Sequence, residues 1–198
     1  MKYIKIILIL AVLGLALFNT QEVVRPLLFS RARSEAEKEA SQSLARQYDA
    51  VFQGLASKEA ALDGLAASLS TRTSAEEVSG ILEGNLSQFL WLEYTDQAGV
   101  PIALAGERTD SFSLSRPLPG GRRIEAGIDL NSFVETPMRP YVTLLRDPAP
   151  AVKKYSADPR TIVRTLPLDD TGFTLVLHTP AKPRMDSLLI IQGALLAL

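Results

Sequence analysis

The sequence predicts an α+β fold in which a long N-terminal helix packs on a single antiparallel sheet, flanked by transmembrane helices. Three observations support this prediction. Residues 31–70 are rich in strong helix formers, and short apolar stretches separated by turn residues follow from residue 89 onward. In addition, the chain is strongly apolar at both ends. A long helix followed by closely spaced strands is typical of one sheet with helices on a face.

The long helix contains an apolar stripe whose members are alternately four and three residues apart, as in a heptad pattern. The members are Leu44, Tyr48, Val51, Leu55, Leu62, Leu65 and Leu69. Lys58 occupies the one position of this stripe that is not apolar. The stripe fits packing on the domain's own sheet or pairing with a second copy of the chain. We expect intradomain packing for Leu62–Leu69 and a homodimer contact for the membrane-proximal end.

A shorter helix and a series of strands follow. Ser74, followed by Glu76 and Glu77, is a suitable N-cap for a helix over residues 75–87. The predicted strands are 89–95, 100–105, 111–116, 122–130, 141–145, 161–166 and 173–179. Within 122–130 the apolar residues Ile124, Ala126, Ile128 and Leu130 alternate with Arg123, Glu125, Gly127 and Asp129. Residues 131–137 suggest a short helix or turn, and the proline-containing segment 147–159 reads as a loop.

The terminal apolar runs predict the relation of the chain to a membrane. Residues 3–18 contain one charge, Lys5, and end without the small residues of a signal-peptide cleavage site, which favours an uncleaved anchor. Lys2 and Lys5 place the N-terminus in the cytoplasm. Residues 187–198 are apolar but shorter than the roughly 20 residues that span a bilayer. We therefore expect an anchor at 1–24, a periplasmic domain at 25–184, and the truncated start of a second transmembrane helix at 185–198.

Composition excludes several classes of function. The 198 residues have a net charge of −1, which gives no support for nucleic-acid binding. The absence of cysteine excludes thiol catalysis, and His178, the single histidine, cannot form a histidine cluster around a metal. We interpret His178 as a structural residue of the last strand. No nucleophile–base pair and no phosphate-binding motif is evident, so we expect neither an enzyme nor a cofactor.

Three segments together resemble the Cache family of extracytoplasmic sensor domains, which have a PAS-like fold. WLEYTDQAGVPIALAG (91–106) is similar to the family's first hairpin, and RRIEAGIDLNSF (122–133) to its middle strand and following turn. LDDTGFTLVLHTP (168–180) is similar to its final hairpin. The resemblance covers residues 31–180 and implies a single-module sensor. It further implies a small ligand held between the sheet and the loops over its outer face.

A ligand of the carboxylate or amino-acid type would require a guanidinium for its carboxylate and aromatic walls for its body. The candidate ligand-binding residues are Trp91, Tyr94, Arg108, Arg123, Tyr141, Thr143 and Arg146. The same side chains have ordinary structural interpretations: Trp91 and Tyr94 as core, Arg108 as a solvated surface residue, and Arg123 with Glu125 as an ion pair of small energetic consequence.

The sequence thus favours the ligand-sensing domain of a dimeric receptor in the bacterial inner membrane, with the main domain periplasmic. Its output domain would be that of a histidine kinase, a chemoreceptor or a cyclic-di-GMP enzyme. The alternative is a single-pass membrane scaffold of a pilus or secretion assembly, whose small periplasmic α+β domain binds proteins and no metabolite.

Overall fold

The computed structural model describes residues 6–8, 11–12, 14–15, 25–72, 74–158, 160–169 and 171–180. The α+β class and the long helix are confirmed, the helix running from Arg25 to Leu69 as α2. The expectation of a single sheet is wrong, because the strands form two antiparallel sheets. Within the described residues no helix is long and apolar enough to cross a bilayer. The predicted C-terminal membrane segment at 185–198 and most of the predicted anchor at 1–24 lie outside the described residues.

The described chain forms two compact units. The first contains the residues up to Leu44, Pro148–Thr165 and the residues from Val176 onward. The second contains Ala45–Asp147 and Leu166–Leu175. Each unit has its own set of contacts, and the candidate site described below lies wholly within the second unit.

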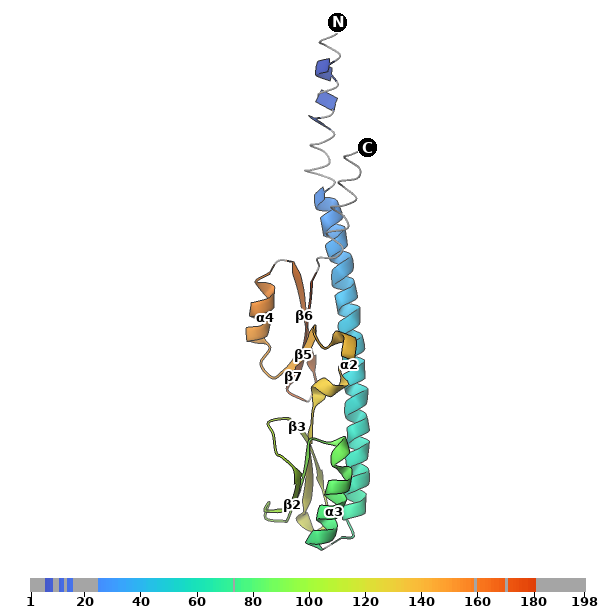
Figure 1. Cartoon of the computed structure of the whole chain (residues 1–198), viewed down its shortest axis with the longest axis vertical. Helices are drawn as coiled ribbons and strands as arrows, with labels where there is room; N and C mark the ends of the chain where they lie inside the picture. The colour runs from blue at the N-terminus through green and yellow to red at the C-terminus, as the bar shows by residue number, and fades with distance from the viewer. Residues whose placement is uncertain are drawn as a thin grey trace. The chain divides into compact units, whose positions relative to one another are not determined.

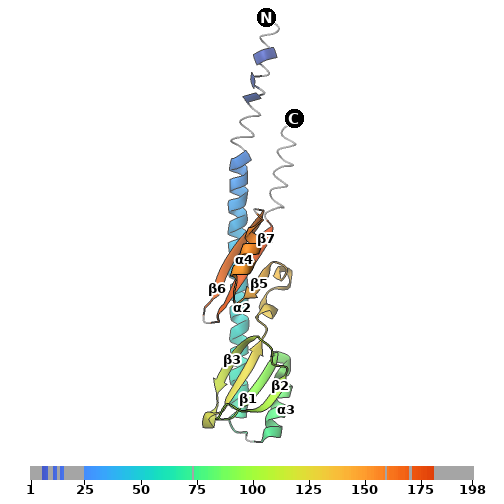
Figure 2. The same ribbon diagram turned by 90° about the vertical axis from the view of Figure 1, so that its left-hand side faces the viewer.

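A four-stranded sheet in the order β2-β1-β4-β3 forms the centre of the second unit. Its strands are β1 (Trp91–Thr95), β2 (Pro101–Gly106), β3 (Phe112–Pro117) and β4 (Arg123–Ile128). Helix α3 (Ala75–Asn85) and the C-terminal half of α2 cover one face of this sheet (Figures 1 and 2). We call this the helix-covered face and the opposite one the outer face. Ser74 is the N-cap of α3, as predicted, although its side chain makes no capping hydrogen bond.

The core of the second unit lies between the helix-covered face and the two helices. Leu92 and Tyr94 of β1 and Ile124 and Ala126 of β4 are at most 2% exposed. The helices supply a set of apolar residues that are at most 5% exposed: Val51, Leu62, Leu65, Leu69, Val78 and Leu82. Four of these six belong to the predicted heptad stripe, so intradomain packing of the C-terminal end of α2 is confirmed. The alternation predicted for β4 is confirmed in the same way.

The segment after β4 is held against α2 by polar and apolar contacts. It forms two 3-10 turns, η4 (Leu130–Phe133) and η5 (Thr136–Met138), where a short helix or turn was predicted. The buried Gln47 side chain donates from Nε2 to Glu135 Oε2 at 2.8 Å and accepts from the Glu135 backbone N–H at 3.0 Å. The Phe133 ring lies on Gly54, where a Cβ atom would be 2.5 Å from Phe133 Cγ. This position of α2 therefore requires glycine.

The remaining strands form a sheet in the order β5-β7-β6. They are β5 (Val142–Leu145), β6 (Thr161–Leu168) and β7 (Phe173–Pro180). The loop predicted for 147–159 is wrong, because Ala149–Ser156 forms the helix α4. Its prolines are compatible with a helix since Pro148 is the N-cap and Pro150 lies in the first turn, where the backbone N–H groups have no intrahelical partner.

Within the first unit, α4 and α2 each contact a strand. The ring of Tyr155 on α4 stacks on His178 of β7, with centroids 3.8 Å apart and planes 16° from parallel. Burial, and secondly the Lys154 ammonium, lower the pKa of His178 below its usual value. Arg164 of β6 forms an ion pair of 2.9 Å with Glu37 of α2. The stacking on Tyr155 packs His178 of β7 against α4.

Candidate functional site

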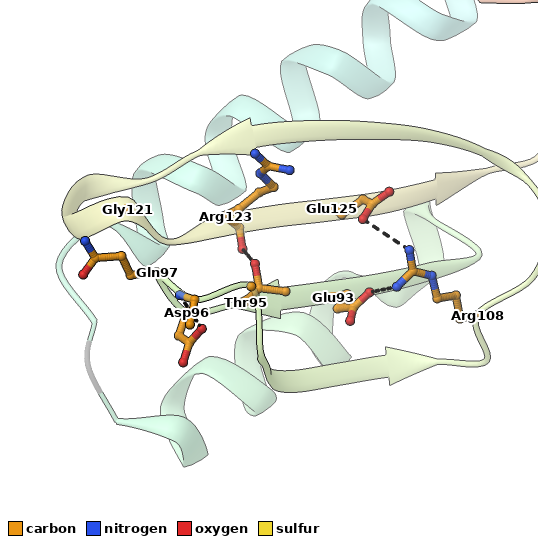
Figure 3. Close-up of a pocket in the computed structure, with 10 residues that line it drawn as sticks. Glu93, Thr95, Asp96, Gln97, Arg108, Gly121, Arg123 and Glu125 are labelled. Carbon is orange, nitrogen blue, oxygen red and sulfur yellow. Dashed lines mark hydrogen bonds and ion pairs between the residues drawn. The ribbon is translucent and has the colours of Figure 1, made fainter.

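The outer face of the four-stranded sheet carries two polar depressions that share Arg108 and Glu125. The first, of about 450 Å³, is lined by Glu93, Thr95, Asp96, Gln97, Ala98, Gly99, Arg108, Gly121, Arg123 and Glu125 (Figure 3). The second, of about 430 Å³, is lined by Trp91, Arg108, Thr109, Asp110, Ser111, Ser113, Glu125 and Arg146. Because they share two side chains, we treat them as one candidate ligand site.

Two carboxylates face each other at the centre of this site. Glu93 of β1 and Glu125 of β4 are direct partners in the antiparallel register, so their side chains leave the sheet side by side on the outer face. Glu93 is only 5% exposed. Like charges at directly opposite positions repel each other, and this repulsion requires a counter-cation. The sheet therefore presents a site whose electrostatics demand a positive charge.

Arg108, which follows β2, supplies this positive charge. Its Nη1 donates to Glu93 Oε2, and its Nη2 lies 3.5 Å from Glu125 Oε2 (Figure 3). The guanidinium also lies 5.1 Å from the centre of the Trp91 ring, in a cation–π arrangement. The Arg108 side chain nevertheless remains 55% exposed. One arginine thus satisfies two carboxylates and an aromatic face while it stays accessible to solvent.

Trp91 forms a fixed wall of the site. Its register partner on β4 is Gly127, and the indole lies over that glycine so closely that a Cβ atom there would overlap the ring. The indole Nε1 donates to Ser111 Oγ at 3.1 Å. Trp91 is 2% exposed, so its position is determined by packing on one side and a hydrogen bond on the other.

The adjacent Arg122 and Arg123 have different environments because successive strand residues point to opposite faces. Arg122 lies by the helix-covered face and donates to the carbonyls of Ser70 and Arg72, at the end of α2. The Arg123 side chain is exposed on the outer face and lines the site. In the part of the chain that the structure describes, its guanidinium has no hydrogen bond or ion pair. Arg123 is therefore a cationic group available to a ligand.

Of the seven predicted ligand-binding residues, the structure brings Trp91, Arg108, Arg123 and Arg146 together at this site. Arg146 is engaged by an ion pair of 3.2 Å with Asp110 and by the Ser111 carbonyl. The alternative interpretation of Arg123 as an ion-pair partner of Glu125 is wrong, because Glu125 pairs with Arg108.

The other three predicted residues lie elsewhere. Tyr94 is buried on the helix-covered face, and its hydroxyl has no hydrogen-bond partner among the described residues. Thr143 lines a separate depression of about 380 Å³ beside Asp129 and Arg139. Tyr141 is 40% exposed and lines none of these three depressions.

The sequence predictions omitted Glu93 and Glu125 from the site. A signal for Glu93 is present in the sequence: it is the one charged residue of β1, between Leu92 and Tyr94. A charge in such a strand is favourable only where it is paired. No comparable signal marks Glu125, whose partnership depends on the register between β1 and β4.

Comparisons with known proteins give no assignment. No family model matches the chain, and no match was found among the curated proteins or the solved structures. Within the described residues, no group of three or more His, Cys, Asp or Glu side chains is placed to hold a metal ion. The site must therefore be interpreted from its own chemistry.

Proposed function

We propose that the chain is the extracytoplasmic ligand-sensing part of a bacterial transmembrane receptor, with a Cache-like domain at 25–184 that binds a small polar metabolite. The observation that carries this proposal is the polar depression on the outer face of the sheet. There, Arg123, whose guanidinium has no partner among the described residues, and the fixed Trp91 lie beside the two carboxylates that pair with Arg108. Arg123 is suited to a ligand carboxylate, as its guanidinium has two parallel donors.

The contacts after β4 give binding a connection to the long helix. β4 carries Arg123 and Glu125 on its outer face, and the segment that follows it is held to α2 through Gln47–Glu135 and Phe133–Gly54. A ligand that shifts β4 would therefore change the packing of α2, provided it binds one arrangement more tightly than the other. In the receptor, α2 follows the predicted anchor at 1–24 and pairs with a second copy at its membrane-proximal end.

The test is a metabolite screen on the whole chain purified in detergent micelles. Trp91 is the only tryptophan, so its fluorescence reports on the site directly. We expect some small carboxylates or amino acids to raise the melting temperature and change the Trp91 emission together. The substitution R123A should abolish the response to these compounds. A broad panel without any shift would contradict the proposal.

One observation favours the alternative of a membrane-anchored assembly scaffold. The edge strand β2 and the turn before it expose apolar side chains: Val100 is 56%, Ile102 41% and Leu104 53% exposed. Exposed apolar groups on an edge strand suit a protein partner that adds a strand. If L104E abolishes the cellular function while the metabolite screen is negative, the scaffold is the better assignment.

A further inference from the structure

Arg108 occupies the position that a ligand cation would take. Its guanidinium faces two carboxylates and the Trp91 ring. A pair of carboxylates beside an aromatic face is a general recognition site for ammonium and guanidinium groups. The register of β1 against β4 produces this arrangement, because it places Glu93 opposite Glu125 and Trp91 opposite Gly127. Arg108 itself comes from outside the sheet.

We infer that Trp91, Glu93 and Glu125 form a subsite for an organic cation, an alkylammonium or a guanidinium, and that Arg108 is an internal competitor which the ligand displaces. This inference rests on the proposed function and specifies the ligand chemistry of the same site.

Displacement requires that the groups that receive the ligand are buried and fixed, and that Arg108 is accessible to solvent. The exposed fractions of these side chains meet both requirements. The Glu93 side chain is 7% exposed and Trp91 is 2% exposed, so the receiving groups are fixed in the sheet. The Arg108 side chain is 55% exposed and lies after the end of β2, at Gly106. Arg108 can therefore leave for solvent without loss of core packing. An incoming cation would find both carboxylates and the ring already placed.

The inference reverses the expected role of Arg108. If Arg108 bound a ligand carboxylate, removing its charge would weaken binding. If Arg108 competes with a ligand cation, removing its charge raises the fraction of open sites and strengthens binding. An ion pair with one exposed partner contributes only a small free energy. Removal of the Arg108 charge should therefore raise the affinity for a ligand cation by roughly threefold to tenfold.

The experiment titrates the full chain in detergent micelles at about 150 mM salt, which screens long-range charge effects. The probes are methylguanidine and 1,4-diaminobutane as cations, succinate as an anion and glycine as a zwitterion. Trp91 fluorescence and the melting temperature report binding. We expect R108Q to bind the two cations roughly threefold to tenfold more tightly than the wild type. E93Q should abolish cation binding in the same assay.

R116Q is the control, because it removes an equal charge from β3 of the same sheet, but from a side chain that pairs with Asp63 of α2 and does not line the site. We expect it to change cation affinity less than about twofold. Equal tightening in R116Q and R108Q would mean that only the net charge of the sheet matters, and would overturn displacement. If R108Q unfolds from repulsion between Glu93 and Glu125, the double substitution R108Q/E125Q removes one of the facing charges. That variant should bind cations through Glu93 more tightly than the single variant E125Q, in which Arg108 still pairs with Glu93.

The outcomes separate this inference from the proposed function. If succinate or glycine binds the wild type and R108Q loses that binding, the site is a ligand site but the cation subsite is wrong. If neither cation binds R108Q or the double variant, displacement is likewise overturned. If no compound in the broader metabolite screen binds any variant, the proposed function falls as well.

Discussion

The contact between Trp91 and Gly127 gives the sharpest test of the site's geometry. In the substitution G127A, the new Cβ atom would lie 2.5 Å from Cδ1 and Cε2 of the indole. The indole cannot remain in place, and overpacking of this kind costs about 1–3 kcal/mol. Displacement of the ring also breaks the hydrogen bond to Ser111, which contributes about 1 kcal/mol. We therefore expect G127A to lower the free energy of unfolding by about 2–4 kcal/mol.

The control is the same substitution at Gly80, in the interior of α3, where a Cβ atom meets nothing within 4 Å. Alanine has the higher helix propensity, so G80A should raise the free energy of unfolding by about 0.5–1 kcal/mol. The assay is urea denaturation followed by both circular dichroism and tryptophan emission. In G127A the native emission should also shift to the red, because Trp91 loses its buried position. If G127A is as stable as G80A and keeps the native emission, the indole does not lie over Gly127 and the site is built differently.

Three further predictions concern the contacts around the site and in the first unit. Q47L removes both hydrogen bonds to Glu135 and should lower the free energy of unfolding by about 2–4 kcal/mol, whereas E135Q, which keeps both bonds, should cost less than about 1 kcal/mol by urea denaturation. R122A removes the donors to the carbonyls at the end of α2 and should lower the free energy of unfolding by about 1–2 kcal/mol. The neighbouring substitution R123A should change the free energy of unfolding by no more than about 0.5 kcal/mol. Equal losses in the two variants would refute the assigned roles. Because the pKa of folded His178 lies below 6.5, the unfolded chain binds the proton more tightly. This contribution to stability is present above pH 6.5 and is lost as the pH falls through the folded pKa, so the wild type should lose more stability than H178F between pH 7.5 and 5.

The elements predicted correctly are those whose signal is local. The stripe in α2 follows the helical period, and the alternation in β4 follows the period of a strand, so both could be read from the sequence. The segment that forms helix α4 reads as a loop in the sequence because proline usually ends a helix, although proline fits the first helical turn. The division into two sheets was missed because strand partnership is non-local. β5 pairs with β7 and not with the sheet that contains β4, and the residue pattern of β5 does not indicate this partner.

The site shows the same division between local and non-local information. Trp91 and Tyr94 are three residues apart on one strand, so alternation places them on opposite faces, and they could not both contact one ligand. This was available from the sequence. The pairing of Glu93 with Glu125 depends on the register of β1 against β4, which the sequence does not specify by itself. The position of Arg108 depends in turn on that pair.

The electrostatics of the outer face also explain why Arg108 and Arg123 should not be treated alike. A bare pair of facing glutamates would destabilise the sheet, so an unliganded chain needs a cation at that position at all times. Arg108 meets this requirement without a ligand. An external cation must bind the two glutamates more tightly than Arg108 does in order to replace it. Among the described residues Arg123 neutralises no carboxylate, so its charge is available to a ligand on the same face. A ligand with both a cationic and an anionic group would replace Arg108 at the glutamates and pair with Arg123. Its two charged groups would then contact β1 and β4 at once, and β4 leads directly into the segment held by Gln47 of α2.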